Sequence, residues 1–508
     1  MASTQESVPV DSTGSDGSSR RRLSESRLQK YLNVSIMDDV EFLEDYKPGG
    51  LCPVDIGDVL DGKFEVIHKL GHGGIATVWL CYEINTKTWR AVKVNAADKS
   101  SEDCSDMKAI KALNTLSVKR NCIDNSHVAM PIDIFWTTSP NGRHLCSVLP
   151  LLGPRLSGWR GELGKDTDRV NDICYQIAEG LSYIHGNGIC HGDFRPQNIL
   201  MRLEPIDRME KEEMLELIGE PTTAEVWTQG GQRSENAPRE VVKALPWQRF
   251  KKFVTNDIAI VDFGESFESS NPPEKLGIPW EYAAPEVIFD GKPSISSDIW
   301  SLACTLLEAR LGSRLAGDLV SIIRRMERFI SPVPYPFRPV AERMVYDQKL
   351  EEQARGELYP ESELIPPQNL QSGEDGASEP MSGAIDVPIN KAEERENEVS
   401  QYSHPLQKKL GSKQMVIEMQ RPADAPPGAK GKKVLTFYTL PDEEVLLLAD
   451  LLGKMFQYEP GKRIKAADVL KHEWYKKRQT MLVSVFISRF LGELHLGFLE
   501  SQYLFLSL

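Results

Sequence analysis

Polar side chains of four chemical types lie close together in one short stretch of the chain. Residues 189–200 read I-C-H-G-D-F-R-P-Q-N-I-L, and the polar members of interest are His191, Asp193, Arg195 and Asn198. Pro196 lacks a backbone N–H and fixes φ, which predicts a rigid loop rather than a helix. A carboxylate can accept a proton, a guanidinium can balance anionic charge, and an amide oxygen can ligate a divalent cation. The stretch therefore has the residue types that group transfer requires.

The spacing of these residues resembles the catalytic loop of protein kinases, H-R-D-x-x-x-x-N, with Gly192 in place of the arginine. The resemblance implies that Asp193 deprotonates the attacking hydroxyl, Arg195 offsets charge on the phosphoryl group, and Asn198 ligates Mg²⁺. The pattern H-G-D-x-x-x-x-N is also typical of small-molecule phosphotransferases of the aminoglycoside and choline kinase type. The rest of the chain must decide between these two classes.

A glycine-rich segment and a lysine-bearing strand precede the loop. Residues 64–67 alternate like a strand and lead into K-L-G-H-G-G-I-A-T-V at 69–78, where glycines let backbone N–H groups close over phosphates. The next strand, W-R-A-V-K-V at 89–94, places Lys93 to reach the α- and β-phosphates of ATP. With the hinge described next, the predicted nucleotide-binding residues are Leu70, Gly71, His72, Gly73, Gly74, Ile75, Ala76, Val78, Ala91, Lys93, Leu149, Pro150 and Leu152.

A helix and a hinge are expected to complete the nucleotide site. The apolar spacing over 105–115 predicts a helix on which Asp106 takes the place of the usual glutamate and pairs with Lys93, with Glu102 as the alternative. The strand 143–149 then leads into the hinge between lobes. There Leu149 would lie behind the base, and the Pro150 carbonyl and the Leu152 N–H would bind adenine.

Landmarks downstream separate the two classes of phosphotransferase. An apolar strand ends in D-F-G, which presents Asp262 as the second metal ligand, and A-P-E at 284–286 closes the following segment. Asp298 opens a central helix of the large lobe, and Arg463 is expected to pair with Glu286. Small-molecule phosphotransferases lack this set. The order of motifs therefore predicts an α+β, bilobal protein-kinase fold with a small β-rich N-lobe and a larger, mainly helical C-lobe.

Composition shifts predict the boundaries of the parts. We expect a Ser-rich disordered leader at 1–45 and the kinase N-lobe at 46–148. The first part of the C-lobe is assigned to 149–332, with a spacer insert at 202–255 that has a helix at 209–218. An acidic, largely disordered insert at 333–432, the end of the C-lobe at 433–478 and an apolar extension at 479–508 complete the chain.

Charge, cysteines and hydropathy give weaker limits. Most of the net charge of −14 lies in one segment, because 13 acidic and 3 basic residues lie between Glu351 and Ser400. The net charge therefore says little about the predicted active site. The eight cysteines are scattered without a C-x-x-C pair, which predicts reduced thiols in the cytoplasm and nucleus. Charged residues interrupt the apolar extension, which argues against a membrane span and leaves either a docked helix or a gene-model artefact. We expect a monomer that binds neither membrane nor nucleic acid directly.

Segments around the motifs resemble one kinase family more narrowly, the SR-protein kinases of the fungal kind. The similar stretches are Y-K-P-G-G at 46–50, V-D-I-G-D at 54–58, L-I-G-E-P at 217–221 and D-F-G-E-S-F at 262–267, together with the spacer before D-F-G. The resemblance covers residues 46–332 and 433–478. It implies a serine/threonine kinase that uses ATP and Mg²⁺ to phosphorylate serines in Arg/Ser-rich proteins such as splicing factors.

The chain departs from the family pattern at three places. Arg195 stands where the family has lysine, Asp106 is short, and no threonine lies at the usual spacing before Tyr282, where Ile278 and Pro279 are found. These departures leave a catalytically weak or inactive pseudokinase scaffold as the alternative hypothesis. Because Gly192 offers no cation to receive an activating phosphate, we expect the segment 262–286 to be competent without phosphorylation.

Overall fold

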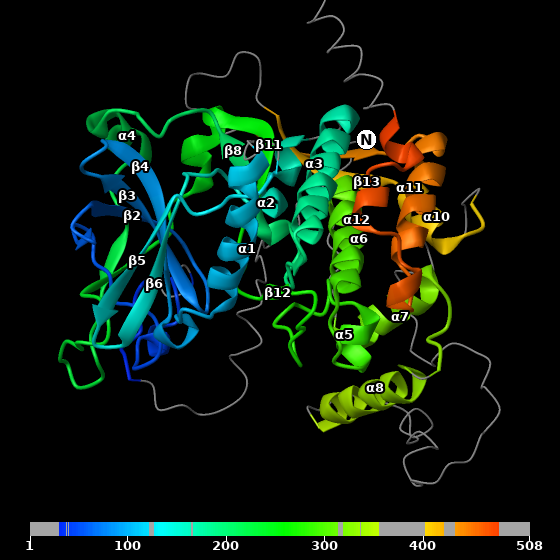
Figure 1. The fold of residues 1–508 in the computed structure, drawn as a ribbon, viewed down its shortest axis with the longest axis horizontal. Helices are drawn as coiled ribbons and strands as arrows, with labels where there is room; N and C mark the ends of the chain where they lie inside the picture. The colour runs from blue at the N-terminus through cyan, green and yellow to red at the C-terminus, as the bar shows by residue number, and fades with distance from the viewer. Residues whose placement is uncertain are drawn as a thin grey trace, which may run out of the picture.

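The computed structural model describes residues 30–36, 38, 40–120, 126–163, 166–312, 318–335, 337–354, 402–420 and 432–476. They form two lobes, a β-rich one at the left of Figure 1 and a helical one at the right. This arrangement confirms the predicted bilobal α+β fold. Within the described part, no helix is both long and apolar enough to cross a membrane.

The N-lobe is built on one antiparallel sheet of six strands in the order β1-β2-β3-β4-β6-β5. Its members are β1 (Val59–Leu60), β2 (Phe64–His72), β3 (Ala76–Glu83), β4 (Thr88–Asn95), β5 (Asp133–Ser139) and β6 (Gly142–Leu149). The β2–β3 hairpin shifts register between Lys69 and Gly71, so the bulge lies at the start of the glycine-rich segment. Helix α1 (Ser105–Arg120) follows η4 (Ala97–Lys99) and carries Asp106 in its first turn.

The C-lobe core forms around the buried helix α6 (Ile295–Leu311), in which every residue from Ser297 to Leu311 is buried. Helix α3 (Thr167–Gly186) packs beside it and is capped by the side chain of Asp166. The other helices of this lobe are α2 (Leu156–Leu163), α5 (Pro285–Phe289), α7 (Leu319–Phe329), α8 (Phe337–Ala354), α10 (Pro405–Gly411), α11 (Asp442–Met455) and α12 (Ala466–Val469), with short turns η9 (Pro460–Lys462) and η10 (Glu473–Tyr475).

Two small antiparallel ribbons hold the loops of the predicted site in the C-lobe. Strands β7 (Ile189–Cys190) and β12 (Phe267–Glu268) pair at one end of the catalytic loop. Strands β8 (Ile199–Leu203) and β11 (Val254–Ile260) pair at the other end, after the turn η5 (Pro196–Asn198). The ladder between β8 and β11 places the D-F-G residues beside the loop, because β11 ends two residues before Asp262.

The prediction of a disordered leader at 1–45 is wrong for its last third. Tyr31 is fully buried, forms a β-bridge with Thr228, and donates its hydroxyl to the carbonyl of Tyr46 at 3.1 Å. Leu43 is buried too, at the start of η3 (Leu43–Asp45). These side chains pack on Val226, Ala237 and Val241 of the spacer, a partner that local periodicity in the sequence does not reveal. Residues 1–29 lie outside the described part.

The spacer between β8 and β11 is folded and lies against the N-lobe sheet. It contains α4 (Lys211–Ile218), β9 (Thr223–Glu225), β10 (Glu240–Val242) and η6 (Trp247–Phe253). Helix α4 lies beside β4 at the left of Figure 1, and Trp89 of β4 donates its indole N–H to the carbonyl of Met209 at 2.8 Å. The predicted helix at 209–218 is confirmed, but the remainder, interpreted as loop, contains two paired strands.

The insert at 333–432 is more ordered than predicted where the structure describes it. Helix α8 occupies residues 337–354, α10 precedes strand β13 (Gln414–Gln420), and β13 pairs with β14 (Lys432–Tyr438). The prolines that favoured a loop are compatible with these helices, since Pro339 lies in the first turn of α8 and Pro405 is the first residue of α10. Residues 355–401 and 421–431, and the predicted apolar extension 479–508, lie outside the described part.

Candidate active site

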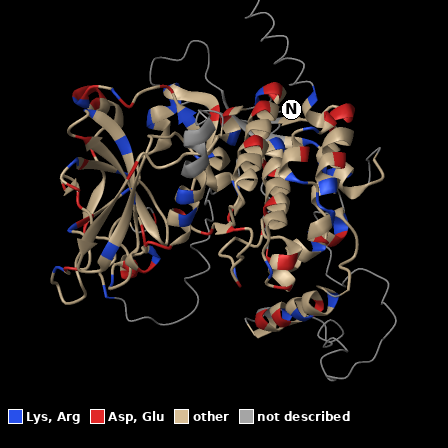
Figure 2. Cartoon of the chain, viewed as in Figure 1, with Lys and Arg blue, Asp and Glu red and all other residues tan. Residues whose placement is uncertain are grey.

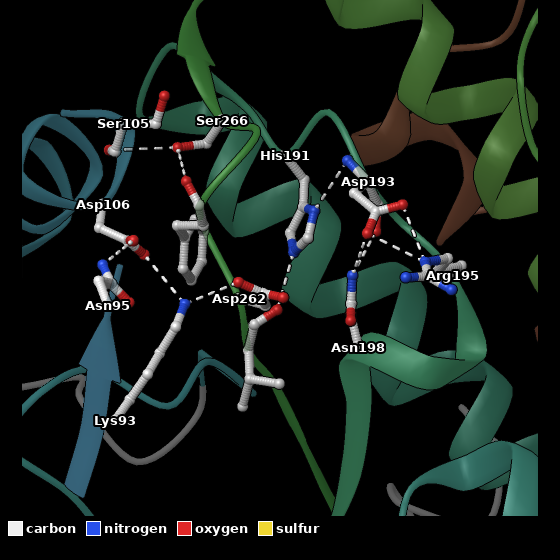
Figure 3. Close-up of polar contacts among 12 residues, drawn as sticks. Lys93, Asn95, Ser105, Asp106, His191, Asp193, Arg195, Asn198, Asp262 and Ser266 are labelled. Atoms are coloured by element: carbon white, nitrogen blue, oxygen red, sulfur yellow. Dashed lines mark hydrogen bonds and ion pairs between the residues drawn. The ribbon is translucent and has the colours of Figure 1, made fainter. Parts of the chain in front are cut away.

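The predicted base and its neighbours form one hydrogen-bonded group in the catalytic loop (Figure 3). Arg195 donates from Nε to the Asp193 carboxylate at 2.9 Å. Asn198 donates from Nδ2 to both the carbonyl and Oδ2 of Asp193 at 2.8 Å. The Asn198 amide is thereby oriented with its oxygen on the side away from Asp193, which suits a ligand of a divalent cation.

Burial raises the pKa of Asp193 above its ordinary value. The Asp193 side chain is largely enclosed, and loss of hydration disfavours the carboxylate. Arg195, His191 and Asn198 oppose this effect without cancelling it. A carboxylate with an elevated pKa and a guanidinium within hydrogen-bond reach is suited to accept a proton.

His191 links the catalytic loop to the D-F-G segment. Its Nδ1 accepts a hydrogen bond from the Asp193 N–H at 3.3 Å, so Nε2 donates to the carbonyl of Val261 at 3.1 Å. The ring lies 5.5 Å from Phe194 and 5.1 Å from Phe263 between ring centroids. This imidazole is therefore part of the packing that holds Asp193 and Asp262 in one arrangement.

Asp298 of α6 accepts hydrogen bonds from the backbone of the catalytic loop. Its carboxylate accepts from the N–H of His191 at 2.6 Å and from the N–H of Gly192 at 3.0 Å. Gly192 has a φ of +78°, and an added Cβ would lie 2.2 Å from the carbonyl oxygen of Glu265. The glycine in the arginine position is thus required by this backbone, because a side chain there is strained and would clash.

Lys93 of β4 lies between two carboxylates. Its Nζ is 2.8 Å from Oδ1 of Asp262 and 3.7 Å from Oδ1 of Asp106. Glu102, the alternative partner, pairs instead with Arg143 at 3.3 Å on the surface. Asp106 is therefore the residue of α1 that the fold brings to Lys93, at a distance beyond a hydrogen bond.

The pKa values of Lys93 and Asp262 are both shifted in this group. The Lys93 ammonium lowers the pKa of Asp262 to about 2. Burial would lower the pKa of Lys93, but the carboxylates of Asp106 and Asp262 outweigh it and raise that pKa. Both groups are charged at neutral pH, and Lys93 is available to bind phosphate oxygens.

Most of the predicted nucleotide-binding residues lie on adjoining strands of the N-lobe sheet, whereas residues 73–75 lie between β2 and β3, and Pro150 and Leu152 follow β6. In the register, Val78 of β3 pairs with Lys93 of β4, and Ala91 pairs with Leu149 of β6. The tip between β2 and β3 is closed by a hydrogen bond from the Gly73 N–H to the Ala76 carbonyl at 2.9 Å. After β6, Leu151 is buried and Leu152 is half-buried.

The predicted pair of Glu286 and Arg463 is present and completely enclosed. Arg463 donates from Nη1 and Nη2 to the two oxygens of Glu286 at 2.7 and 2.6 Å. Ser297 donates to the same carboxylate at 2.7 Å. This bidentate pair ties α5, at the end of the segment 262–286, to the turn after η9.

Two residues near the site were missed in the sequence. Asn95 donates to Oδ2 of Asp106 at 3.1 Å and orients the short carboxylate; its position two residues after Lys93, on the same face of the strand, was the available signal. Ser266 donates to the carbonyl of Phe263 at 2.7 Å and closes the turn after D-F-G. Nothing in the spacing of motifs indicated that hydrogen bond.

Comparison with known proteins agrees with this geometry. Residues 64–218 match the protein kinase domain family. This match covers less than half of the chain. Its relatives include the serine/threonine-protein kinase spk-1 of Caenorhabditis elegans, which is 36% identical over 174 residues, covering 33% of this chain and 17% of the relative. The human SRSF protein kinase 3 is 36% identical over 173 residues, covering 32% and 30%. The serine/threonine-protein kinase SRPK of Physarum polycephalum is 29% identical over 292 residues, covering 54% and 66%.

These relatives are named as serine/threonine-protein kinases or as an SRSF protein kinase, which agrees with the family resemblance in the sequence. The alignments span less than a third of the nematode and human proteins. Residues of both charge signs alternate along the chain in both lobes (Figure 2).

Proposed function

We propose that this chain is an ATP-dependent serine/threonine protein kinase of the SR-protein-kinase type, which phosphorylates serines in Arg/Ser-rich proteins such as splicing factors. The observation that carries the proposal is the approach of Lys93 to Asp262 on one side of His191, with Asp193 hydrogen-bonded to Arg195 and Asn198 on the other. These residues come from both lobes and from three separate motifs. The kinase relatives support the same activity.

In this proposal each side chain has one role. Lys93 binds the α- and β-phosphates and is held by the carboxylates of Asp106 and Asp262. Asp193 accepts the proton of the substrate hydroxyl, and Arg195 balances negative charge on the transferred γ-phosphoryl group. The product is a phosphoserine, and ADP leaves with the oxygen that bridged its β-phosphate to the γ-phosphorus. Positioning and charge stabilisation account for most of such a rate.

Asn198 and Asp262 fit the needs of a Mg²⁺ ion bound together with ATP. Mg²⁺ prefers oxygen ligands and is commonly held by one or two carboxylates plus substrate phosphates. Asp262 ionises readily, since its pKa is lowered to about 2, and the Asn198 amide is fixed by Asp193. When bound, the ion would neutralise charge on the phosphates. We also propose that the protein acts as a monomer in the cytoplasm and nucleus.

We further propose that the segment 262–286 needs no activating phosphate. Gly192 offers no cation, and the Glu265 carboxylate already accepts from the Gly277 N–H at 2.8 Å, which joins the two halves of the segment. Ser266 is buried and hydrogen-bonded, which leaves Ser269 and Ser270 as the exposed hydroxyls. Phosphatase treatment should leave activity unchanged. Loss of activity, restored by rephosphorylation of this segment, would contradict the proposal.

The test of the function is phosphate transfer from Mg-ATP to an Arg/Ser-repeat peptide, with Asp193→Asn as the variant and Asp257→Asn, an exposed aspartate of β11, as the matched control. We expect transfer by the wild type and the control. Asp193→Asn should lose at least about a thousandfold in kcat while binding ATP normally. ATP binding without transfer in the wild type would favour the pseudokinase scaffold, and transfer to amino-sugars or choline alone would favour a small-molecule phosphotransferase.

A further inference from the structure

A fully buried ion pair joins the segment before the kinase domain to the strand that carries the glycine-rich loop. Lys69 of β2 places its Nζ 2.6 and 2.7 Å from the two carboxylate oxygens of Glu41. Both side chains are only 1% exposed. Glu41 lies 23 residues before Phe64, where the match to the kinase domain family begins.

Further contacts close this ion pair off from water. The Tyr46 hydroxyl donates to Oε1 of Glu41 at 2.5 Å, and the Lys69 ammonium lies 4.8 Å from the centre of the Trp79 ring. Although burial opposes ionisation, the ammonium and the Tyr46 hydroxyl lower the pKa of Glu41. Burial lowers the pKa of Lys69 even though the Glu41 carboxylate opposes this shift, so the ammonium depends on Glu41 as its counter-charge.

Lys69 lies at the base of the nucleotide loop. The next residue is Leu70, and the β2–β3 register shifts between Lys69 and Gly71. Lys69 pairs with Trp79 of β3, whereas the next residue, Val78, pairs with Lys93 of β4, so Lys69 lies on the face of the sheet opposite Lys93. The Lys69 carbonyl also accepts from the Leu245 N–H of the spacer at 2.8 Å. Side chain and backbone of Lys69 are thus both held by segments outside the sheet.

We propose that Glu41 and Lys69 are positioning residues for ATP, which fix the base of the glycine-rich loop from the outer face of the sheet. The inference rests on the proposed function and assigns part of the nucleotide site to a segment outside the kinase domain match. Without Glu41, the ammonium has no counter-charge in its enclosed site and must either lose its proton or move toward water. Either change releases β2 at its bulge and displaces Leu70 and Gly71.

The test measures ATP affinity in the full chain with a fluorescent ATP analogue, together with the KM for ATP and the melting temperature. Glu41→Gln and Lys69→Met should each weaken ATP binding by about tenfold, the scale expected when a binding segment is displaced by a fraction of an ångström to an ångström. The kcat for peptide should change less than the KM for ATP. The charge-reversed double variant E41K/K69E should recover part of the lost affinity, because it restores the ion pair.

Glu65→Gln and Lys211→Met supply the matched control. This ion pair also involves β2, with a 2.7 Å contact, but it is about a third exposed and lies at the opposite end of the strand. Its variants should leave ATP affinity within about twofold, as expected for a partly exposed pair. A purely structural role for Glu41 and Lys69 predicts a lower melting temperature with unchanged ATP affinity, and that result would overturn the proposal.

Tyr46→Phe provides a milder test if Glu41→Gln and Lys69→Met do not fold. It removes only the hydroxyl that holds Glu41, so we expect a folded protein with ATP affinity reduced about two- to threefold. Unchanged affinity in Tyr46→Phe would contradict the proposal. Because nucleotide binding is measured without phosphate transfer, a protein that binds ATP but phosphorylates no peptide would refute the proposed function and leave this inference standing.

Discussion

Lengthening Asp106 by one methylene should make the proposed kinase faster. Asp106 lies 3.7 Å from the Lys93 ammonium, whereas Asp262 lies at 2.8 Å. Asp106→Glu extends the carboxylate by roughly the missing distance. At an effective dielectric constant of about 20, closing the gap to hydrogen-bond length strengthens the attraction by about 1.4 kcal/mol. That energy corresponds to at most about a tenfold rise in kcat/KM for ATP.

The opposite change tests the same contact. Asp106→Asn removes the charge but keeps the size and the neighbour Asn95. We expect kcat/KM for ATP to fall by about ten- to a hundredfold, because part of the lost Coulomb energy is offset by easier hydration of Lys93. Asp103→Asn, an exposed aspartate just before α1 begins, is the control and should behave as wild type.

Steady-state kinetics with Mg-ATP and an Arg/Ser-repeat peptide decides the outcome. Equal rates for wild type and Asp106→Glu would show that the pair is already optimal or does not contribute. A loss of activity in Glu102→Gln, with none in Asp106→Asn, would show that the surface glutamate rearranges to become the partner. Either result would refute the assignment of Asp106.

Three further predictions follow from the geometry. Arg463→Met leaves the enclosed Glu286 carboxylate without its counter-charge and should cost about 3–5 kcal/mol of stability. Calorimetry should show a melting temperature lower by about 10 °C. Lys462→Met, the control in an exposed pair beside it, should leave the melting temperature unchanged. Burial raises the pKa of Asp193, and Arg195 lowers it. Arg195→Met should therefore move the acidic limb of the pH profile of kcat/KM to higher pH. An unchanged acidic limb would mean that a group other than Asp193 controls it. Gly192→Ala should lower activity and cost about 1–3 kcal/mol, since its Cβ meets the Glu265 carbonyl at a positive φ; a wild-type melting curve would contradict this.

The site could be predicted from the sequence because its parts are short loops with fixed internal spacing. Asp193, Arg195 and Asn198 come within hydrogen-bond distance through the loop's own backbone, and the strand that ends at Ile260 brings Asp262 beside them. The choice between Asp106 and Glu102 needed the orientation of α1 relative to β4. That orientation depends on packing between elements, which the spacing of residues within α1 does not determine.

The segments that surround the kinase lobes were predicted poorly for a physical reason. Tyr31 and Leu43 are buried against Val226 and Val241, so the apolar residues of the leader have their partners almost two hundred residues away. Local periodicity identifies an element that buries one regular face, whereas these residues are irregularly spaced and fill gaps. The prolines near the starts of α8 and α10 were interpreted as loop residues, although a proline in the first turn is compatible with a helix.

The packing of residues 30–46 on the spacer has a consequence for the order of events during synthesis. Tyr31 cannot form its bridge to Thr228, nor Leu43 its contacts with Val241, until the ribosome has made the catalytic loop and most of the spacer. At typical translation rates the gap from residue 46 to residue 241 takes about 10–40 s. During that interval the outer face of the small lobe exposes apolar side chains to the solvent and to chaperones. The N-lobe, although first in sequence, therefore completes its folding only after part of the C-lobe has been synthesised.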